Sequence, residues 1–523
     1  MVKSIKQINF TMLLGWVSLT LLTVVTFGTL VVVYLKSHNN FNLSATDLKI
    51  IKFTAYQAVI SATISAILGI FLARALTRKS FMGKSILITI LGAPFILPII
   101  VAVLGLISVF GRNGIINRSL ELIGIENISI YGLHGIIIAN TFFNLPLVSR
   151  LLLHGWNSIP AEQIRLAESL GFKKRDIFFL IELPMLRTRL PGIFAVVFLI
   201  CVSSFSIALT LGGGPKSTTI ELAIYQAFRY DFDLSKAANL AVIQFAMCFI
   251  ITIIVLWTQK TQSFQVSFDR VNVRWTKKND SFFDWIVISI CSIFLIAPLL
   301  IIVIEGIFSL HLINSIIFIS LIKSILVASG ATVLCLFLTF SLANVIVTHN
   351  NKNQIKWLME SSAYFIIASS PLVIGTGFFI FLFPVINPVK IVFPITALIN
   401  AIMAVPFSLR IILPAMQKIN QDYGKLSESL GLNGYEKFIT LTLPRMKREI
   451  GFSIGLISAL SIGDLGVITL FSSPQSGTLP MTIYRLMGSY QMEAAKAASF
   501  LLLLSCFLIF FLSDKMARSN AKH

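Results

Sequence analysis

Long apolar runs recur along this chain, and they constrain its fold more than any other feature. A helical run of about 18 residues or more is long enough to cross the ~30 Å hydrocarbon core of a bilayer. Apolar residues make up 56% of the 523 positions and charged residues only 12%, far from the balance of a soluble domain. The sequence therefore predicts an all-α polytopic membrane protein. We expect about twelve spans, centred near residues 22, 65, 98, 142, 200, 248, 294, 333, 370, 402, 460 and 504.

The charged residues indicate how the chain is oriented. Its formal net charge is +20. If the N-terminus is cytoplasmic and the spans alternate, most Lys and Arg fall in cytoplasmic loops, which is the usual bias of membrane proteins. Topology accounts for the basic excess, so we expect the lipid bilayer as a partner and no nucleic acid. Both termini are expected in the cytoplasm. The first run, Phe10 to Leu35, is too long for the apolar region of a signal peptide and is expected to span.

The sequence contains two copies of one unit. The stretch LAESLGFKKRDIFFLIELP (166–184) aligns without a gap with LSESLGLNGYEKFITLTLP (426–444), at an offset of 260, and eight of the nineteen residues are identical. The unit holds six expected spans, an even number, so both copies share one orientation and form two parallel six-helix repeats. We expect a first half at 1–258, a polar cytoplasmic linker at 259–281 and a second half at 282–523.

Each copy of the repeated stretch lies in a cytoplasmic loop between the fourth and fifth spans of its half. A short helix is expected to end at Gly171 or Gly431, where a residue with positive φ can turn the chain. A second helical piece follows, apolar on one side, and is expected to stop at Pro184 or Pro444. Two short helices of this kind would make a rigid basic knob that suits docking into a groove of a soluble partner. A hairpin that only sets orientation would need charge but not the repeated spacing.

The repeated loop resembles that of the membrane permeases of type I ABC importers, whose pattern is E-A-A, three residues, G, nine residues, I, one residue, L-P. In that family the loop forms the coupling helices that insert into the ATPase subunits. The E-A-A places read Arg165-Leu166-Ala167 and Lys425-Leu426-Ser427, so the carboxylate that would meet the ATPase stays open. The resemblance implies two copies of an ATP-binding-cassette ATPase as partners. It assigns coupling to Glu168, Gly171, Ile181, Leu183, Pro184, Glu428, Gly431, Leu441, Leu443 and Pro444.

A second stretch narrows the resemblance. GGGPKSTTIELAIYQA, within residues 201–244, is similar to the permeases of bacterial thiamine importers, which are fused two-half chains of about this length. The resemblance implies that the chain translocates thiamine across the inner membrane and receives it from a periplasmic thiamine-binding protein. Whether thiamine phosphates are also transported stays open. Alternatives are the same type of permease for another cargo such as iron(III), an ion-driven secondary transporter, and a membrane scaffold or receptor. A secondary transporter would need buried acid or histidine relays, which are few here, and has no use for two matched loops.

The chain carries no enzyme motif that we can identify. A phosphate-binding loop would need G-x-x-x-x-G-K-[ST], and the nearest stretch, Gly83-Lys84-Ser85, has Arg78 in place of the first glycine. The five cysteines are odd in number and lie in apolar runs, and the six histidines are scattered. We therefore expect no catalytic residue, no metal and no cofactor, with ATP hydrolysis by the partner ATPase.

Two further groups of residues are candidates for contact with the substrate and with its binding protein. A charged group inside a span is costly, which singles out Asp464 of the eleventh span; it aligns with Ser204 of the fifth. In the resembled family these two spans line the pathway, and a carboxylate with aromatic faces suits a cationic substrate. The alternative is that Asp464 hydrogen-bonds a neighbouring helix or lies near the outer interface of the membrane. The candidate pathway residues are Ser204, Phe205, Asp464 and Phe471. The candidate docking residues for the binding protein are Glu221, Asp231 and Asp233, in an outer loop.

Overall fold

The computed structural model describes residues 2–38, 44–91, 97–258, 282–348, 359, 366, 369–432, 434–472 and 477–519. Within these ranges the only regular secondary structure is helical, and no β-strand occurs. The all-α prediction is therefore confirmed. The expected linker at 259–281 lies outside the described residues.

The first half runs from the N-terminus to residue 258. Its spanning helices are interrupted by shorter ones at both ends of the bundle. The elements are α1 (Val2–Thr23), a π-helical turn (Val24–Gly28), α2 (Thr29–His38), α3 (Ala45–Arg78), α4 (Lys84–Ile90), α5 (Ile99–Phe110), α6 (Ile115–Leu122), α7 (Leu133–Asn157), α8 (Ala161–Ser169), α9 (Lys174–Ile177), the π-helical turn η3 (Phe178–Glu182), α10 (Leu183–Val202), α11 (Phe205–Leu211), α12 (Ile220–Arg229) and α13 (Leu234–Thr258).

The second half repeats this order with small differences. The elements are α14 (Phe282–Phe308), α15 (Ser315–Thr348), α17 (Pro371–Leu382), α18 (Val392–Ser429), α19 (Gly434–Lys437), the π-helical turn η7 (Phe438–Thr442), α20 (Leu443–Arg445), α21 (Lys447–Ile462), α22 (Gly466–Phe471), α23 (Leu479–Gly488) and α24 (Met492–Ser519).

Eleven helical stretches in the described part of the chain are long and apolar enough to span a membrane. Ten of them contain the centre of a predicted span, among them the two long helices α3 and α15, each of 34 residues. The eleventh, Ile99–Leu122, begins just beyond the predicted centre near residue 98. The expected span near residue 370 corresponds to α17, which has 12 residues and is too short by itself. The ninth of the twelve expected spans therefore stays a prediction, because α17 follows residues outside the described ranges.

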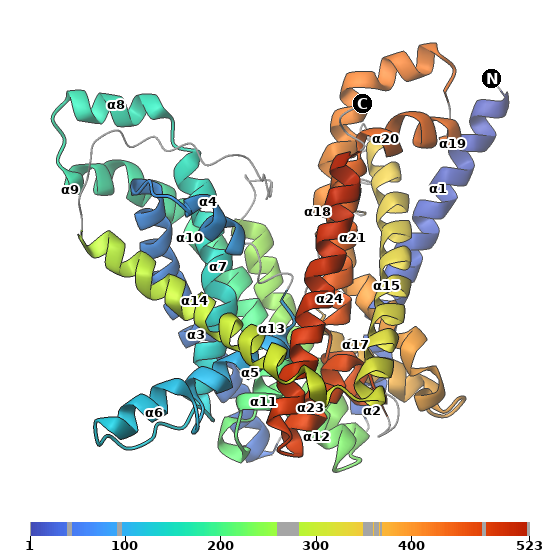
Figure 1. The fold of residues 1–523 in the computed structure, drawn as a ribbon. Coiled ribbons are helices and arrows are strands. Elements are labelled where there is room, and N and C mark those ends of the chain that lie inside the picture. Colours follow the sequence, from blue (N-terminus) through green and yellow to red (C-terminus); the bar gives the residue numbers. More distant parts are fainter. Residues whose placement is uncertain are drawn as a thin grey trace.

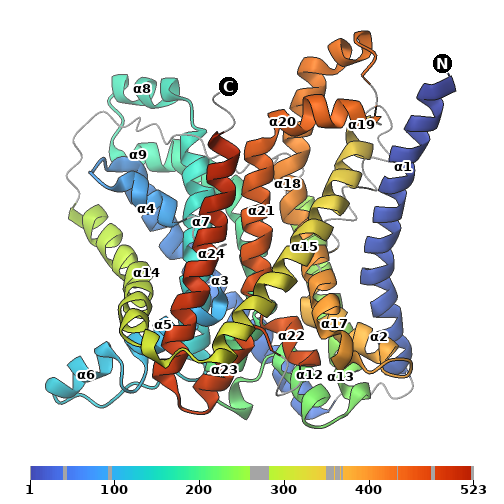
Figure 2. The same ribbon diagram turned by 45° about the vertical axis from the view of Figure 1, so that its right-hand side comes forward.

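The helices form two groups that meet at one end and diverge at the other (Figure 1). α8 and α9 lie at the divergent end of one group, and α19 and α20 lie at the divergent end of the other. The N-terminus and the C-terminal end of α24 lie at that same end (Figures 1 and 2). α11, α12 and α23 lie at the opposite end. Both copies of the repeated loop thus point the same way, as two parallel repeats require.

The first helix of each half packs against the other half. α1 contacts α15, and α14 contacts α5 and α3. Glycine permits each crossing: a Cβ on Gly15 would collide with Val345, and one on Gly105 would lie 2.5 Å from the carbonyl oxygen of Pro298. The two repeats are therefore interlocked.

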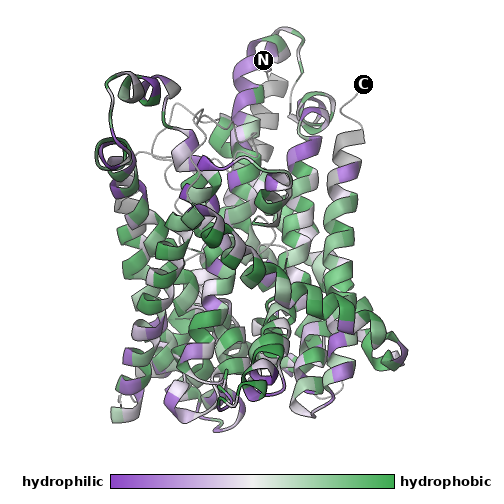
Figure 3. Ribbon diagram, turned by 60° about the vertical axis from the view of Figure 1, so that its left-hand side comes forward, coloured by the Kyte–Doolittle hydropathy of each residue, from purple (hydrophilic) through white to green (hydrophobic). Residues whose placement is uncertain are grey.

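The outer surface of the bundle is apolar over most of its height, with hydrophilic residues gathered toward the two ends (Figure 3). α14 illustrates this, because Ile290, Ile293 and Leu300 are all more than half exposed. Such a band is expected where helices face lipid tails. All five cysteines are buried, as expected for small side chains that lie in apolar runs.

Candidate functional site

Both repeated loops turn at their glycine. Gly171 has φ of 73° and Gly431 has φ of 69°, in the left-handed region that side chains with a Cβ rarely adopt. The amide of Phe172 donates to the carbonyl of Ala167 (3.0 Å), and Leu432 donates to Ser427 (2.9 Å). This is the hydrogen bond of a glycine-terminated helix. The expected backbone conformation is confirmed in both copies.

The prediction that the second helical piece stops at the proline is wrong. α9 and α19 lead into the π-helical turns η3 and η7, and Pro184 and Pro444 then lie in the first turn of α10 and α20. The amide of Leu183 donates to the carbonyl of Phe178, and Leu443 does the same to Phe438. Proline lacks an amide proton and clashes in a helix interior, but the first turn of a helix needs no such donor. Both loops therefore continue directly into the following helix.

The two loops differ before the glycine. In the first, α7 ends at Asn157 and α8 is a separate helix, whereas α18 runs unbroken for 38 residues through the matching positions. Pro160 stands at the break and aligns with Asn420, which can donate its amide proton and continue a helix. Arg189 Nη2 donates to Ser158 Oγ at 3.0 Å and ties this turn to α10.

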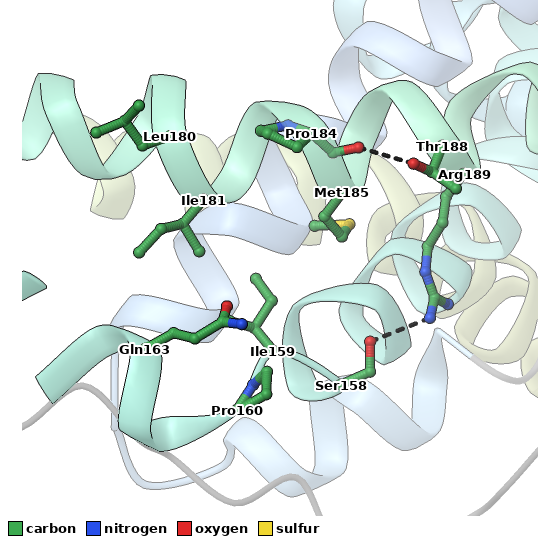
Figure 4. Close-up of a pocket in the computed structure, with 10 residues that line it drawn as sticks. All are labelled: Ser158, Ile159, Pro160, Gln163, Leu180, Ile181, Pro184, Met185, Thr188 and Arg189. Carbon is green, nitrogen blue, oxygen red and sulfur yellow. Dashed lines mark hydrogen bonds between the residues drawn. The ribbon is translucent and has the colours of Figure 1, made fainter. Parts of the chain in front are cut away.

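The break leaves a pocket of about 370 Å³ inside the first loop (Figure 4). Ile159 and Pro160 line one side, and Ile181 and Met185 line the other. Thr188 donates to the carbonyl of Pro184 at its edge. Ile181 thus faces its own loop and is only partly exposed.

Each loop also exposes two leucines that were not among the predicted coupling residues. Leu166 and Leu170 are each 61% exposed, and their repeat equivalents Leu426 and Leu430 are 53% and 65% exposed. Residues four apart lie on one face of a helix, so each loop presents a matched pair. Three predicted coupling residues, Ile181, Leu183 and Leu441, are half-buried. Six are exposed: Gly171, Pro184, Glu428, Gly431, Leu443 and Pro444. Glu168 lies in α8, and its side chain is outside the described set.

The fifth span of the first half and the eleventh span are both broken, and the predicted pathway residues lie at the breaks. Ser204 follows the end of α10 and precedes α11; its hydroxyl donates to the carbonyl of Cys201 at 2.9 Å. Asp464 lies between α21 and α22, where its Oδ1 accepts from the amide of Gly466 at 3.0 Å. A carboxylate at this place stabilises the start of α22. Asp464 also has a side-chain hydrogen bond with Asn400 of α18, so the alternative of a bond to a neighbouring helix has support as well.

Phe205 and Asp464 come together from different halves, but Phe471 lies elsewhere. A Cβ built on Gly466 would lie 3.5 Å from Asp464 Oδ1 and 3.9 Å from Phe205 Cδ1, so both side chains flank this glycine. Tyr225 packs edge-on against Phe205, with ring centroids 5.4 Å apart. Phe471 is fully buried and packs against Phe379 at 5.8 Å. The structure thus groups Phe205, Tyr225 and Asp464, and places Phe471 in the core.

Two buried asparagines hold the broken helices, and the sequence analysis missed them. Asn140 donates to Gln57 Oε1 (3.0 Å), and Gln57 in turn donates to the carbonyl of Cys201 (2.8 Å). In the second half Asn400 donates to Ser461 Oγ at 3.1 Å. Asn140 and Asn400 are 260 positions apart, as are Cys201 and Ser461. The repeat offset alone was a signal that could have found them.

The acids predicted to dock a binding protein do not share one environment. Asp231 and Asp233 are exposed at the end opposite the loops. Glu221 is only 1% exposed, and its Oε1 accepts from Gln244 at 3.4 Å. Burial raises the pKa of Glu221 to about 7. Its placement at an outer docking surface is therefore corrected: α12 turns this carboxylate inward.

The stretch Gly83-Lys84-Ser85 is not built like a phosphate-binding loop. Lys84 is 7% exposed and donates its ammonium group to the carbonyl of Lys79 at 2.9 Å. Burial lowers the pKa of Lys84. Its cation is thus used within the chain, whereas a phosphate-binding lysine has to reach the phosphates.

Interlocked helical repeats, broken fifth spans and two glycine-turned loops together define a membrane transport component. A family model described as binding-protein-dependent transport system inner membrane component matches residues 57–262. The chain belongs to this family of ABC importer permeases and is a multi-pass inner-membrane protein.

Several curated relatives are similar over most of their length. The chain is 36% identical over 483 residues to the thiamine transport system permease protein ThiP of Escherichia coli (strain K12), covering 90% of both chains. It is 35% identical over 487 residues to ThiP of Salmonella typhimurium, again covering 90% of both. ThiP of Brucella abortus (strain 2308) is 35% identical over 480 residues, which cover 90% of this chain and 88% of that one.

Proposed function

We propose that this chain is the membrane-spanning subunit of an ATP-driven importer for thiamine. The observation that carries the proposal is the identity to thiamine transport permeases along 90% of this chain and of its relatives. The two halves, 1–258 and 282–523, act as two transport repeats joined by the linker at 259–281. Iron(III) and ion-driven alternatives are not favoured by these relatives.

The two loops would each dock one ATPase subunit. The support is the matched pair of exposed leucines on each loop, since an apolar pair on a rigid helix suits a groove in a partner. Both loops lie at one end of the molecule, with the two termini (Figure 1). We assign that end to the cytoplasm, where ATP is available. The chain itself then hydrolyses nothing and transmits the movement of the two ATPase subunits.

Thiamine would pass between the halves near the broken helices. Its thiazolium ring carries a positive charge, which the face of an aromatic ring attracts within about 6 Å. Phe205 and Tyr225 supply such rings, and Asp464 supplies a carboxylate beside them. Alternating access follows if the diverging ends of the two groups close when the ATPases close, while the opposite ends separate. Ser204 lies at the break and would contribute through its hydroxyl, which donates to the carbonyl of Cys201.

The outer end would receive a periplasmic thiamine-binding protein. Asp231 and Asp233 are the exposed predicted acids there. Exposed charges are screened within ~8 Å at physiological ionic strength, so docking through them should weaken as salt is raised. Neutralising both with Asn should weaken transport at low salt; unchanged transport would remove this docking role.

The experiment that tests the proposal is uptake of radiolabelled thiamine into proteoliposomes. They would contain this chain with its co-purified ATPase, with binding protein outside and ATP inside. We expect uptake only when all three components are present. If ATP hydrolysis is stimulated by the binding protein but thiamine stays outside, the cargo assignment is wrong while the coupling role survives.

A further inference from the structure

A carboxylate is buried where the first loop meets α3. Glu182 is the last residue of η3 and its side chain is 1% exposed. Arg74 Nε lies 2.7 Å from Glu182 Oε2, and Arg78 Nη2 lies 3.5 Å from Oε1. The two arginines are four residues apart in α3 and therefore share one face of it. A buried carboxylate is tolerated when it is paired, so the cluster fixes the position of Glu182.

The same helix holds the other end of η3. The guanidinium carbon of Arg74 lies 4.7 Å from the centroid of the Phe178 ring, and Phe178 is the first residue of η3. Arg74 thus contacts both the first and the last residue of this π-helical turn. The turn cannot slide along α3 without breaking an ion pair or a cation–π contact.

At its other end α3 reaches the predicted substrate pathway. Gln57 donates to the carbonyl of Cys201, just before the helix break at Ser204, at 2.8 Å. Thr54 Oγ1 accepts from the amide of Ile220, the first residue of α12, at 2.9 Å. One continuous helix therefore links the loop with the break that carries Phe205.

The second half keeps the contact at the far end of the helix, and no ion pair joins loop and helix among its described residues. In α15, Ser324 Oγ accepts from the amide of Leu479 at the start of α23 (2.7 Å), which matches the contact of Thr54. Thr442 stands at the place of Glu182, and its hydroxyl reaches only the carbonyl of Lys437 at 3.4 Å. Phe438 packs edge-on against Phe340 of α15, with centroids 5.3 Å apart, where Phe178 meets Arg74. The second loop thus meets its long helix through this ring pair.

We propose that Glu182 is a positioning residue for transport: its buried cluster with Arg74 and Arg78 transmits movement of the first loop to α3, whereas the described residues of the second loop form no ion pair with α15. The inference rests on the proposed docking of an ATPase to each loop. An ion pair with defined geometry moves two elements together, whereas apolar surfaces allow small sliding. The first half would therefore respond more rigidly to the ATPase than the second.

The direct test measures distances between spin labels in lipid nanodiscs without nucleotide. One pair of labels joins Ile67 of α3 to Ser169 of α8, and the matched pair joins Phe337 of α15 to Ser429 of α18; all four positions are exposed. We expect Glu182→Gln to broaden the first distance distribution and leave the second unchanged. Thr442→Val, the matched control, should leave both unchanged. Broadening of both pairs by Glu182→Gln, or of neither, would overturn the proposal.

The functional test measures transport per ATP hydrolysed in the complete complex. Glu182→Gln should lower this ratio about fivefold, at the low end of usual coupling energies, while Thr442→Val should not change it. If Glu182→Gln does not assemble, Arg78→Gln removes the longer of the two ion pairs and leaves Arg74 in place, so it should broaden the first distance less. An unchanged ratio with narrow distances in either variant would contradict the joint. The distance test needs no thiamine, so failure of thiamine uptake by the unmodified complex would count against the cargo and not against the joint.

Discussion

The two repeated loops of this protein carry the same motif but are attached to the bundle differently. Both turn at a glycine with positive φ and both enter the next helix through a π-helical turn. The first loop follows a helix break at Pro160 and is held to α3 by the Glu182 cluster. The second loop follows directly from the unbroken 38-residue helix α18. The motif therefore specifies the shape presented to a partner, and residues outside the motif specify how that shape is linked to the membrane helices.

The largest effect is expected from changing the glycine turn, which both loops share. Proline holds φ near −65°, so Gly171→Pro and Gly431→Pro cannot adopt the observed turn. Each should lower thiamine uptake about tenfold or more without loss of membrane insertion, because misplaced coupling elements lose most of their effect. Uptake in proteoliposomes and a membrane-fraction blot measure the two quantities. Gly171→Asn is the matched control, since Asn tolerates positive φ. Wild-type uptake by both proline variants would contradict the coupling assignment.

The next effect tests what differs before the glycine. Asn420→Pro should break α18 where the first half is already broken, at a cost of about 3 kcal/mol for proline in a helix interior. It also removes the hydrogen bond from Lys437 Nζ to Asn420 Oδ1. We expect a lower thermal unfolding midpoint and weaker ATPase binding. Pro160→Asn should lower the stability far less, because Arg189 also holds the turn between α7 and α8. Equal losses in the two variants would show that the loops do not differ in this way.

The smallest effect is expected at the end of the molecule opposite the loops, where the two halves also differ. The first turn of α12 contains Glu221, and the first turn of α23 contains Pro480 at the matching position. Burial raises the pKa of Glu221 to about 7, above the ~4.3 of a free glutamate. The folded state therefore binds this proton more tightly than the unfolded state. The contribution of this group to stability falls as pH rises from about 4 to 7.

Glu221→Gln removes that buried charge. We expect the thermal midpoint to rise by about 1 °C at pH 8, as for a change near 1 kcal/mol in a chain of this length, with almost no rise at pH 4. Scanning calorimetry or dye-free fluorescence in detergent measures both values. Glu126→Gln, at an exposed position, serves as the control. An equal rise at both pH values would mean that charge is not the cause.

Much of the fold could be predicted because it depends on periodic features. Apolar run length located eleven spans, and a fixed offset revealed the duplication and its parallel sense. Gly171 and Gly431 were predictable because few residues other than glycine tolerate their φ. The π-helical turns were not, since they arise from the way a proline is accommodated after packing of the loop, and the letters Leu-Pro are also compatible with a helix end.

Contacts between distant segments could not be predicted. Glu182 occupies the free position of the motif, and Arg74 and Arg78 read as ordinary basic residues at the end of a span. Only packing of η3 on α3 makes them a buried cluster. Glu221 was misplaced for the same reason, because the direction in which α12 faces is set by its neighbours. Aligning the two repeats does help. Asn140 aligns with Asn400, which marks a position that the halves share, and Glu182 aligns with Thr442, which marks a position where they differ.

The central claim is that each half docks one ATPase subunit through its own loop. Native mass spectrometry of the purified complex without ATP tests it most directly, by counting ATPase copies per chain. We expect two copies for the unmodified chain, one for Leu170→Asp or Leu430→Asp, and none for the double variant, since each change places a charge in one exposed apolar pair. Two copies retained in both single variants, or both copies lost in either, would contradict the account.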